Sequence, residues 1–171
     1  MVHKFDYGGV KLNLRTAEEV TEGFKAIRDS VLAKNPKARI QGIIVEEMVE
    51  KGQEVILGVN NDPQFGPLLM FGLGGIYVEA LEDVTFRLAP VTMLSAQRMI
   101  TTTKTFKILD GYRGGPVYDV PAIEECLERL SQLAVDFDEI QELDINPLIV
   151  LPKGMGCRIV DARIILKENT A

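Results

Sequence analysis

The sequence predicts an α+β fold in which a mixed or antiparallel sheet is flanked by helices. Short runs of strand-like character are bounded by glycine, proline and asparagine clusters, and separate segments show helical periodicity. The pattern contains no internal repeat, and no linker rich in glycine, serine or charge divides it. At 171 residues the chain suits one domain but is short for a complete two-substrate enzyme. We therefore expect a partner or a further segment.

The first third of the chain predicts a strand, a helix and two more strands. Residues 10–14 alternate between apolar and polar side chains, which is the period of a half-buried strand. Thr16 and Glu19 form a capping box, after which apolar residues recur at helical spacing as far as the Asn-Pro pair at 35–36. Two strand candidates follow, at 40–49 and 54–59.

The rest of the chain predicts further strands around two helices. The segment Gly72-Leu73-Gly74-Gly75 separates two β-prone runs and predicts a sharp turn or a close approach of backbone to a ligand. Residues 152–156 predict the turn of a hairpin. The expected strands are 68–71, 76–81, 86–89, 140–145, 148–151 and 158–166, and the expected helices are 94–103 and 122–135.

Composition and charge narrow the classes of function. The net charge of -6 argues against a nonspecific grip on nucleic acid, and no apolar run is long enough to cross a bilayer. We therefore expect a soluble, cytoplasmic protein. Cys126 and Cys157 are far apart in sequence and lack metal-ligand spacing, so we interpret them as buried or incidental thiols.

The N-terminal segment contains the only histidine, His3, followed by a lysine, a carboxylate and a glycine pair. Imidazole can accept a phosphoryl group, and glycine amides can approach phosphate closely. The pattern alone fits an ordinary surface histidine near a terminus equally well.

A second polar cluster is expected near the C-terminal hairpin. On a strand, Asp144 and Asn146 point to the same face, and the hairpin can bring Asp161 alongside them. Carboxylate and amide oxygens suit Mg²⁺, which also keeps waters and nucleotide phosphates in its shell. In the alternative interpretation the aspartates lie in solvent or pair with Arg163 and Arg158.

Two further segments are candidates for ligand contact. The glycines at 72–75 and the guanidinium of Arg87 could together hold a phosphate, although the spacing of a P-loop is absent and sharp turns explain most glycine pairs. Residues 46–49 end a predicted strand, where backbone groups and a methionine could meet an adenine ring. An ordinary core strand with exposed carboxylates explains residues 46–49 as well.

Several motifs in order resemble one family. HKFDYGGVKLNL, DPQFGPLLMFGLGGIYVEALEDVTFRLAP, and LDINPLIV followed by VDARIIL are similar to the β-subunit or β-region of ADP-forming acetyl-CoA and acyl-CoA synthetases. The resemblance covers nearly the whole chain and extends to succinyl-CoA synthetase. It implies an ATP-grasp fold, of which this chain is the larger C-terminal portion. It also implies the reversible reaction of an acid, CoA and ATP to acyl-CoA, ADP and phosphate, through an acyl phosphate and a phosphohistidine.

The resemblance also implies roles for particular residues. His3 matches the histidine of the family's HKSD-type motif, which relays phosphate between the nucleotide site and a histidine of the CoA-binding partner. Asn146 and Asp161 match the magnesium-binding positions, and Asp144 matches an acidic residue that supports the phosphohistidine.

The nucleotide-binding positions implied by the resemblance lie in two segments. Glu46, Glu47, Met48 and Val49 fall at the adenine-contacting hinge, and Arg87, Gly74 and Gly75 fall near the phosphate-handling side. The implied cofactors are Mg²⁺ and ATP or ADP. The implied partner is a CoA-binding α subunit or domain of the same enzyme, in a hetero-oligomer.

The sequence departs from the family pattern in two places. Phe5 stands where the family motif has serine, which removes a hydroxyl beside the relay histidine. The family domain also has a preceding region with the smaller ATP-grasp lobe and a nucleotide-binding lysine, which is not part of this chain. We therefore expect residues 1–171 to be a partial ATP-grasp domain, inactive in isolation.

Two other functions stay open from the sequence. The first is a noncatalytic binding or assembly module that keeps the fold and the partner surface, which the substitution at Phe5 favours. The second is another ATP-grasp enzyme, such as a carboxylate-amine ligase, whose product is an amide and in which the histidine has no relay role. Nucleotide binding that depends on Mg²⁺ separates an ATP-binding domain from a purely structural module.

Overall fold

The computed structural model describes residues 7–74 and 83–167 of the chain. The described residues belong to two compact units, one comprising residues 1–48 and the other residues 49–171. The predicted strand at 76–81, His3, Phe5 and Gly75 lie outside the described residues. Among the described residues, no helix is long and apolar enough to span a membrane.

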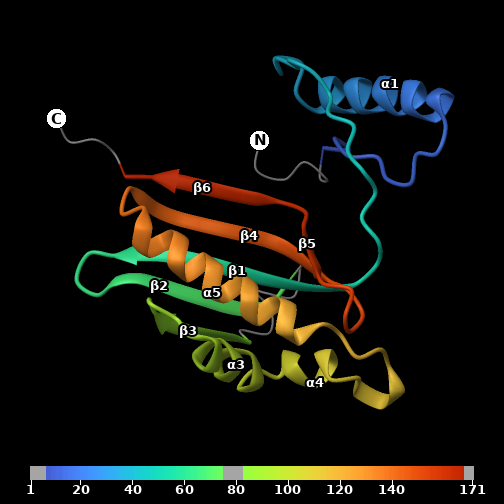
Figure 1. The fold of residues 1–171 in the computed structure, drawn as a ribbon. Helices are drawn as coiled ribbons and strands as arrows, with labels where there is room; N and C mark the ends of the chain where they lie inside the picture. Colours follow the sequence, from blue (N-terminus) through green and yellow to red (C-terminus); the bar gives the residue numbers. More distant parts are fainter. Residues whose placement is uncertain (1–6, 75–82, 168–171) are drawn as a thin grey trace. The chain divides into compact units, whose positions relative to one another are not determined.

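The first unit is built on one long helix, α1 (Ala17–Lys34; Figure 1). The predicted N-cap is confirmed, because the Thr16 side chain accepts a hydrogen bond from the N–H of Glu19 at 3.2 Å. The Glu19 carboxylate in turn accepts from the N–H of Arg15, one residue before the position expected in a capping box. The helix ends at the predicted Asn35, whose N–H bonds back to the carbonyl of Val31 at 2.8 Å.

The predicted strand at 10–14 is wrong, and its residues lie against α1 as irregular backbone. Ser30 donates its hydroxyl to the carbonyl of Tyr7 at 2.9 Å, and the Leu14 side chain lies so close to Gly23 that an added Cβ there would stand 3.2 Å away. A strand needs a neighbouring edge for its hydrogen bonds, and the described part of this unit offers a helix instead.

The predicted strand at 40–49 is also wrong. The segment is irregular, and several of its apolar side chains are exposed, with Ile44 at 82% and Val45 at 67%. The boundary between the two units falls within it, after Met48. The segment is rich in strand-prone residues, but in the described structure no neighbouring strand pairs with it.

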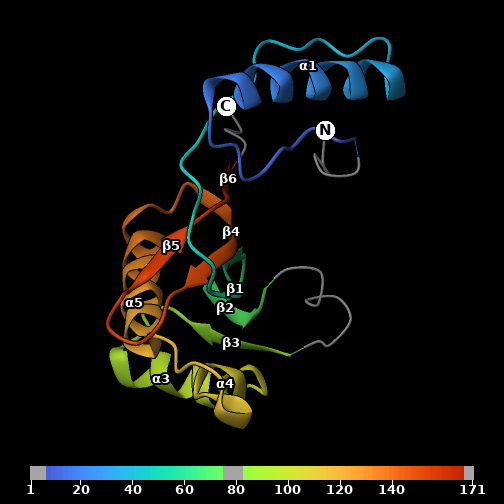
Figure 2. The ribbon, with the colours of Figure 1, turned by 90° about the vertical axis from the view of Figure 1, so that its right-hand side faces the viewer.

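The second unit contains a six-stranded sheet in the order β3-β2-β1-β4-β5, with β6 also paired to β4. Every described pair of neighbouring strands is antiparallel, which confirms the predicted sheet type. Figures 1 and 2 show α5 lying along one face of this sheet. The strands are β1 (Gln53–Asp62), β2 (Gly66–Leu73), β3 (Val84–Leu88), β4 (Ile140–Val150), β5 (Cys157–Ile159) and β6 (Ala162–Leu166).

The helices of this unit are α3 (Met93–Thr101), α4 (Thr105–Leu109) and α5 (Val120–Asp136), with a 3₁₀ turn, η2 (Tyr112–Gly114), before α5. The predicted helices at 94–103 and 122–135 are thereby confirmed as α3 and α5. They cover the apolar face of the sheet. The most deeply buried side chains of this core are Val55, Leu57, Leu69, Phe71, Met99, Ile100, Leu109, Ile123, Leu127, Leu148 and Val150.

The first half of the predicted glycine turn is strand, since Gly72 and Leu73 belong to β2. Gly72 pairs with Ile56 on one side and Val84 on the other, and a Cβ at Gly72 would stand 2.7 Å from the Val84 side chain. Gly74 continues alongside β1 and donates its N–H to the carbonyl of Glu54 at 3.0 Å. Glycine is therefore needed here for close approach of strands.

Strand β4 continues through Asn146–Pro147, where two separate strands were predicted. Its register with β1 passes from Leu57 opposite Ile145 to Val55 opposite Leu148, so two β4 residues oppose one β1 residue. This bulge accommodates the proline, which has no N–H to donate to the ladder. The Asn146–Pro147 peptide bond is cis.

The predicted strand at 158–166 is divided into β5 and β6 by Val160 and Asp161. These two residues lie opposite the bulge: the N–H of Asn146 donates to the Asp161 carbonyl and the N–H of Val160 donates to the Pro147 carbonyl, both at 3.1 Å. The predicted hairpin turn at 152–156 is confirmed, with the Leu151 N–H donated to the Gly156 carbonyl at 3.0 Å.

The N-terminus of α4 is capped from a distant part of the chain. Asp83 accepts hydrogen bonds from the N–H of Lys104 at 2.8 Å and from the N–H and hydroxyl of Thr105 at 2.7 and 2.6 Å. Burial alone would raise the pKa of Asp83, but these hydrogen bonds and the nearby charge of Lys104 outweigh it and lower that pKa. The Asp83 carboxylate thus links the N-terminus of α4 to the residue just before β3 through hydrogen bonds.

Replacing Asp83 with alanine should lower the free energy of unfolding by about 1–2 kcal/mol at neutral pH, the usual cost of losing a cap. Because the pKa of Asp83 is lowered in the folded state, its stabilisation is present above the unfolded pKa of about 4. It is lost as the pH falls through the lower folded value. Urea unfolding followed by circular dichroism should show the two proteins converging in stability toward acid pH.

The matched control is Asp138→Ala, because Asp138 is exposed in the turn between α5 and β4. This substitution should leave the free energy of unfolding unchanged across the same pH range. A stability difference between wild type and Asp83→Ala that stays constant down to about pH 3 would contradict the capping role.

Candidate functional site

The face of the sheet opposite α5 carries the polar residues of the C-terminal strands. Leu143 and Ile145 of β4 belong to the buried core, so the alternating residues Asp144 and Asn146 project from the other face. Both are half-buried. We call this surface the open face, in contrast to the face covered by the helices.

The pairing of β4 with β6 brings two more side chains onto the open face. Arg163 lies directly opposite Asp144, and Ala162 lies opposite Ile145 on the core side. Asp161 precedes Ala162 and is joined to Asn146 by the backbone hydrogen bond across the bulge. Alternation therefore places Asp161 on the open face beside Asn146. The structure thus brings Asp144, Asn146 and Asp161 to one end of one face.

Burial and the neighbouring carboxylates disfavour the ionised form of Asp144. Partial burial raises the pKa of Asp144, the positive charge of Arg163 lowers it, and the negative charges of Glu142 and Asp161 raise it further. The net effect is a raised pKa, because burial and the two negative charges outweigh the attraction of Arg163. The guanidinium of Arg163 itself forms an ion pair with Glu142 at 2.9 Å. A cation placed among these carboxylates would offset their mutual repulsion.

The donor set suits a hard divalent cation whose shell is completed by other ligands. Asn146 offers an amide oxygen and Asp161 an exposed carboxylate, and Mg²⁺ commonly takes one or two protein ligands together with waters and phosphates. Across 7–74 and 83–167, no three histidine, cysteine, aspartate or glutamate side chains are grouped as a metal cage. The residues present therefore fit a shared site, open to nucleotide, and not a site enclosed by protein.

The alternative interpretation had two parts. The exposure of Asp161 agrees with the part in which the aspartates lie in solvent, but the part in which Arg163 and Arg158 pair with them does not match the observed contacts. Arg163 pairs with Glu142, and Arg158 donates to the carbonyl of Cys157 at 2.9 Å. Within the described part of the chain, neither Asp144 nor Asp161 forms a salt bridge. Their carboxylates remain available to a ligand.

The open face also has an apolar part that the sequence did not reveal. Asp144 lies opposite Gly58 of β1, Gly58 opposite Met70 of β2, and Met70 opposite Phe86 of β3. The Met70 side chain lies over Gly58, where an added Cβ would stand 3.3 Å from the methionine methyl group. The row of Asp144, Gly58, Met70 and Phe86 therefore has a carboxylate at one end and an exposed aromatic ring at the other. Only the strand register identifies it.

Arg87 is not brought together with the Asp144 group. It lies opposite Leu69, a core residue, so its side chain is on the face of the sheet that the helices cover, at the edge strand β3. Its guanidinium is exposed and donates to the carbonyl of Phe86 at 2.9 Å. Its predicted contact with phosphate stays a prediction without geometric support from the described residues.

The other predicted nucleotide-binding residues do not belong to the row of Asp144, Gly58, Met70 and Phe86. Glu46, Glu47 and Met48 are exposed in irregular backbone and end the first unit, and half-buried Val49 begins the second. The N–H of Gly74 is already donated to Glu54, so it is not free for phosphate while that pairing persists.

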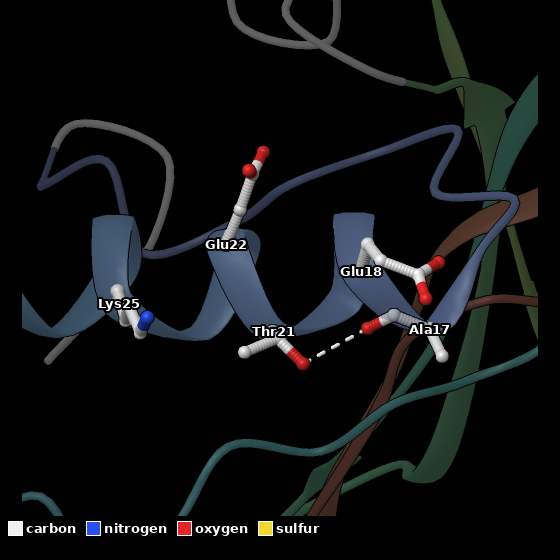
Figure 3. A pocket seen from close by; sticks show the side chains of 5 residues that line it. All are labelled: Ala17, Glu18, Thr21, Glu22 and Lys25. Atoms are coloured by element: carbon white, nitrogen blue, oxygen red, sulfur yellow. Dashed lines mark hydrogen bonds between the residues drawn. The ribbon is translucent and has the colours of Figure 1, made fainter.

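A shallow surface depression of about 300 Å³ lies along α1 (Figure 3). It is lined by five residues of that one helix: Ala17, Glu18, Thr21, Glu22 and Lys25. The Thr21 hydroxyl donates to the carbonyl of Ala17 at 2.9 Å, which is an internal contact of the helix. A depression formed by one exposed helix face lacks converging groups from other elements, so we do not assign a site to it.

Comparison with known proteins identifies the family. The ATP-grasp domain family matches residues 1–166. The 4-hydroxybutyrate–CoA ligase (ADP-forming) of Nitrosopumilus maritimus is 52% identical over 164 residues, which cover 96% of this chain and 24% of that protein. The β subunit of acetate–CoA ligase (ADP-forming) II from Pyrococcus furiosus is 46% identical over 168 residues, covering 98% of this chain and 71% of the subunit.

Solved structures give the same result. An acetyl-coenzyme A synthetase 1 of Ca. Korarchaeum cryptofilum, in complex with coenzyme A, Ca-AMPCP and HgCl+, matches with a TM-score of 0.89 and 48% identity over 97% of this chain and 72% of that chain. The same enzyme in complex with coenzyme A and Mg-AMPPCP, its phosphohistidine segment pointing towards the nucleotide-binding site, matches with a TM-score of 0.85 and 44% identity over 97% of this chain and 71% of that chain.

This chain spans about a quarter of the length of its single-chain relatives and about seven tenths of the separate β subunits. The matches cover nearly all of it in both cases, at identities far above those that show a fold alone. The chain therefore belongs to the ATP-grasp family, with the β subunits and β regions of ADP-forming acetyl-CoA and acyl-CoA synthetases.

Proposed function

We propose that this chain is the nucleotide- and Mg²⁺-binding part of an ADP-forming acid:CoA ligase. The whole enzyme would convert an acid, CoA and ATP to acyl-CoA, ADP and phosphate through an acyl phosphate and a phosphohistidine. The observation that supports this most is the convergence of Asp144, Asn146 and Asp161 on the open face of the sheet. Relatives named as ADP-forming CoA ligases match nearly the whole chain.

Asn146 and Asp161 are proposed to hold Mg²⁺ through one amide and one carboxylate oxygen. Bound there, the ion would neutralise charge on the phosphates during transfer. The backbone hydrogen bond between the two residues fixes their separation, and the bulge in β4 directs Asn146 away from the core. These features orient the two donors before any ligand arrives.

Asp144 is proposed to support the histidine that carries the phosphoryl group. When a ring nitrogen of that histidine bonds to phosphorus and the bond from phosphorus to its leaving oxygen breaks, positive charge develops on the imidazole. A carboxylate facing the other ring nitrogen can accept its N–H and stabilise that charge. A cationic ring would in turn offset the burial and the repulsion that raise the pKa of Asp144.

His3 is proposed as a relay between this nucleotide site and a histidine of a CoA-binding α subunit or domain. The enzyme would then be a cytoplasmic hetero-oligomer or a longer single chain, and residues 1–171 would be a partial ATP-grasp domain. Glu46 to Val49, with a preceding lobe, would contact the base of ATP or ADP. Gly74, Gly75 and Arg87 are assigned to the phosphate side by family resemblance alone.

The second candidate is a noncatalytic module derived from the same domain. Phe5 favours it, because an aromatic ring replaces the hydroxyl next to the relay histidine. Such a module would keep the fold and the partner surface without turnover. Binding and labelling experiments distinguish the two candidates.

Metal-dependent nucleotide binding tests the proposed magnesium ligands. The chain should bind Mn²⁺-ADP, followed by the electron paramagnetic resonance signal of free Mn²⁺. Asp161→Asn and Asn146→Ala should each weaken that binding by roughly tenfold or more, because each removes a ligand oxygen or its charge. Asp138→Asn, which changes an exposed turn carboxylate, should bind as wild type does. Equal affinity of all four proteins would place the metal elsewhere.

Asp144→Asn should raise the free energy of unfolding at neutral pH by a few tenths to about 1 kcal/mol. Since the folded-state pKa of Asp144 is raised, its favourable contribution is present below the unfolded pKa and is lost as the pH rises through the folded value. The asparagine variant has no carboxyl group to ionise and does not lose this stability. Its advantage in free energy of unfolding over wild type should therefore decrease toward acid pH in urea titrations. Glu139→Gln, at an exposed neighbouring carboxylate, is the control. A variant less stable than wild type at neutral pH would show that Asp144 stabilises the fold as an anion.

Acid-labile phosphate at His3 tests the relay. A chain completed with the preceding lobe and mixed with its CoA-binding partner, Mg²⁺ and labelled ATP should incorporate label that is stable to base and lost in acid. His3→Ala should abolish this incorporation at that position and prevent thioester formation. Unchanged thioester formation in His3→Ala would exclude the relay. Nucleotide binding without labelling in either protein would support the noncatalytic module.

A further inference from the structure

The two cysteines, which are far apart in sequence, are neighbours in the fold. Cys126 lies on α5 and Cys157 begins β5, and their sulfur atoms are 3.3 Å apart. Cys157 pairs with Val150, a core residue, so its side chain faces α5. The sulfur of Cys157 also lies 3.9 Å from the carbonyl of Ala122, one turn before Cys126 on the same helix. Both thiols are free and half-buried. Their separation in sequence gave no sign of this contact.

We propose that Cys126 and Cys157 are a modification site that forms a reversible internal disulfide by exchange with a small-molecule disulfide such as oxidised glutathione. The two sulfurs need to approach by only about 1.3 Å to reach the bonded length of about 2.05 Å. Both side chains are half-buried, which leaves a path to solvent for a small reagent. No other cysteine is present in the chain to compete.

The environment of Cys126 favours it as the attacking thiol. The hydrogen bond from Cys157 lowers the pKa of Cys126 to about 7, against partial burial and the negative charge of Glu125, which raise it, while the positive charge of Arg129 lowers it. The thiolate is the nucleophile in exchange, and a pKa near the ambient pH gives the fastest attack. Cys126 is therefore partly ionised at neutral pH.

The environment of Cys157 suits the second, resolving thiol. Its hydrogen bond to Cys126 and its burial raise the pKa of Cys157, as do the charges of Cys126 and Asp119, while Arg158 lowers it. Once Cys126 has reacted, its thiolate charge is gone, and the pKa of Cys157 falls toward its ordinary value. The order of attack follows from this coupling.

The exchange balances in two steps. The Cys126 thiolate attacks one sulfur of the reagent, so a mixed disulfide forms and one reagent thiolate leaves. Cys157 then loses its proton to solvent and attacks the Cys126 sulfur, which expels the second reagent thiolate. Two protein thiols are oxidised and one reagent disulfide is reduced to two thiols. Excess reduced thiol reverses both steps.

The test uses the full chain with oxidised glutathione at neutral pH, followed by intact mass and free-thiol titration. The wild-type protein should lose two hydrogen atoms in mass and both free thiols, with Cys126 and Cys157 peptides joined in a nonreducing digest. Cys157→Ser should stop at one glutathione adduct on Cys126, and Cys126→Ser should react more slowly. Two adducts on the wild-type chain, or no reaction while the fold is intact, would overturn the proposal.

A second measurement separates this chemistry from incidental proximity. Cys157→Ala removes the hydrogen bond to Cys126, so the pH midpoint of Cys126 alkylation should rise from about 7 toward its ordinary value of 9.0. At neutral pH its reaction with oxidised glutathione should slow by roughly five- to tenfold, since part of the lost thiolate is offset by higher nucleophilicity. Cys157→Ser keeps a hydroxyl beside Cys126, so its pH midpoint of Cys126 alkylation should lie between those of wild type and Cys157→Ala. An unchanged midpoint in Cys157→Ala would show that the thiols do not interact.

The oxidised chain should also unfold at a higher temperature, because the bond closes a loop between residues 31 positions apart. A rise in Tm of roughly 5–10 °C is expected, reversed by a reducing phosphine. Circular dichroism of each variant before oxidation checks that it is folded. A fall in Tm on forming the bond would mean that the native packing does not accommodate it.

Discussion

The alternation of side chains along β4 is the constraint on which the core and the proposed site both depend. β4 is the strand that joins β1 to β5 and β6, so its register sets the position of all three neighbours. A slip of one residue would exchange its buried and exposed faces. The bulge at Asn146–Pro147 changes this alternation once, so Leu143 and Ile145 before it and Leu148 and Val150 after it all reach the same core. Without the extra residue, one of these pairs would face the open side.

The open face contains a carboxylate in surroundings that destabilise its charge. Selection for stability alone would replace such a residue. Asp144 is half-buried beside two other carboxylates, and the neighbouring guanidinium of Arg163 is engaged by Glu142. Polar groups held in unfavourable surroundings are typical of sites that bind charged ligands. Elsewhere in the same unit a carboxylate has the opposite environment: Asp83 is surrounded by donors and stabilises a helix end. The contrast between these two aspartates distinguishes the proposed ligand-facing group from a structural one.

Local signals in the sequence identified the elements that depend on local physics. The helices α1, α3 and α5 and the turn at 152–156 follow from caps, periodicity and turn residues, which act within a few positions. The predicted strands at 10–14 and 40–49 are wrong because a strand depends on a partner edge, which the local pattern of side chains cannot reveal. The sequence could not predict which face of the sheet Arg87 occupies, because that depends on strand register. It could not predict the contact between Cys126 and Cys157 either, because that depends on how α5 packs on the sheet. Family resemblance supplied the roles of Asp144, Asn146 and Asp161, while their common face could be argued from alternation alone.

Strand β5 connects the thiol pair with the proposed metal ligands, because Cys157 begins it and Asp161 follows two residues after its end. The position of Asp161 is nevertheless fixed from β4, by the hydrogen bonds that flank the bulge on both of its sides. A disulfide to α5 would restrain the opposite end of β5, where the chain is already paired with Val150. The bond would therefore oppose separation of β5 from the helix more than it would move the Asp161 carboxylate. Oxidation should therefore increase the stability of the fold, while the affinity for a divalent cation stays close to that of the reduced chain.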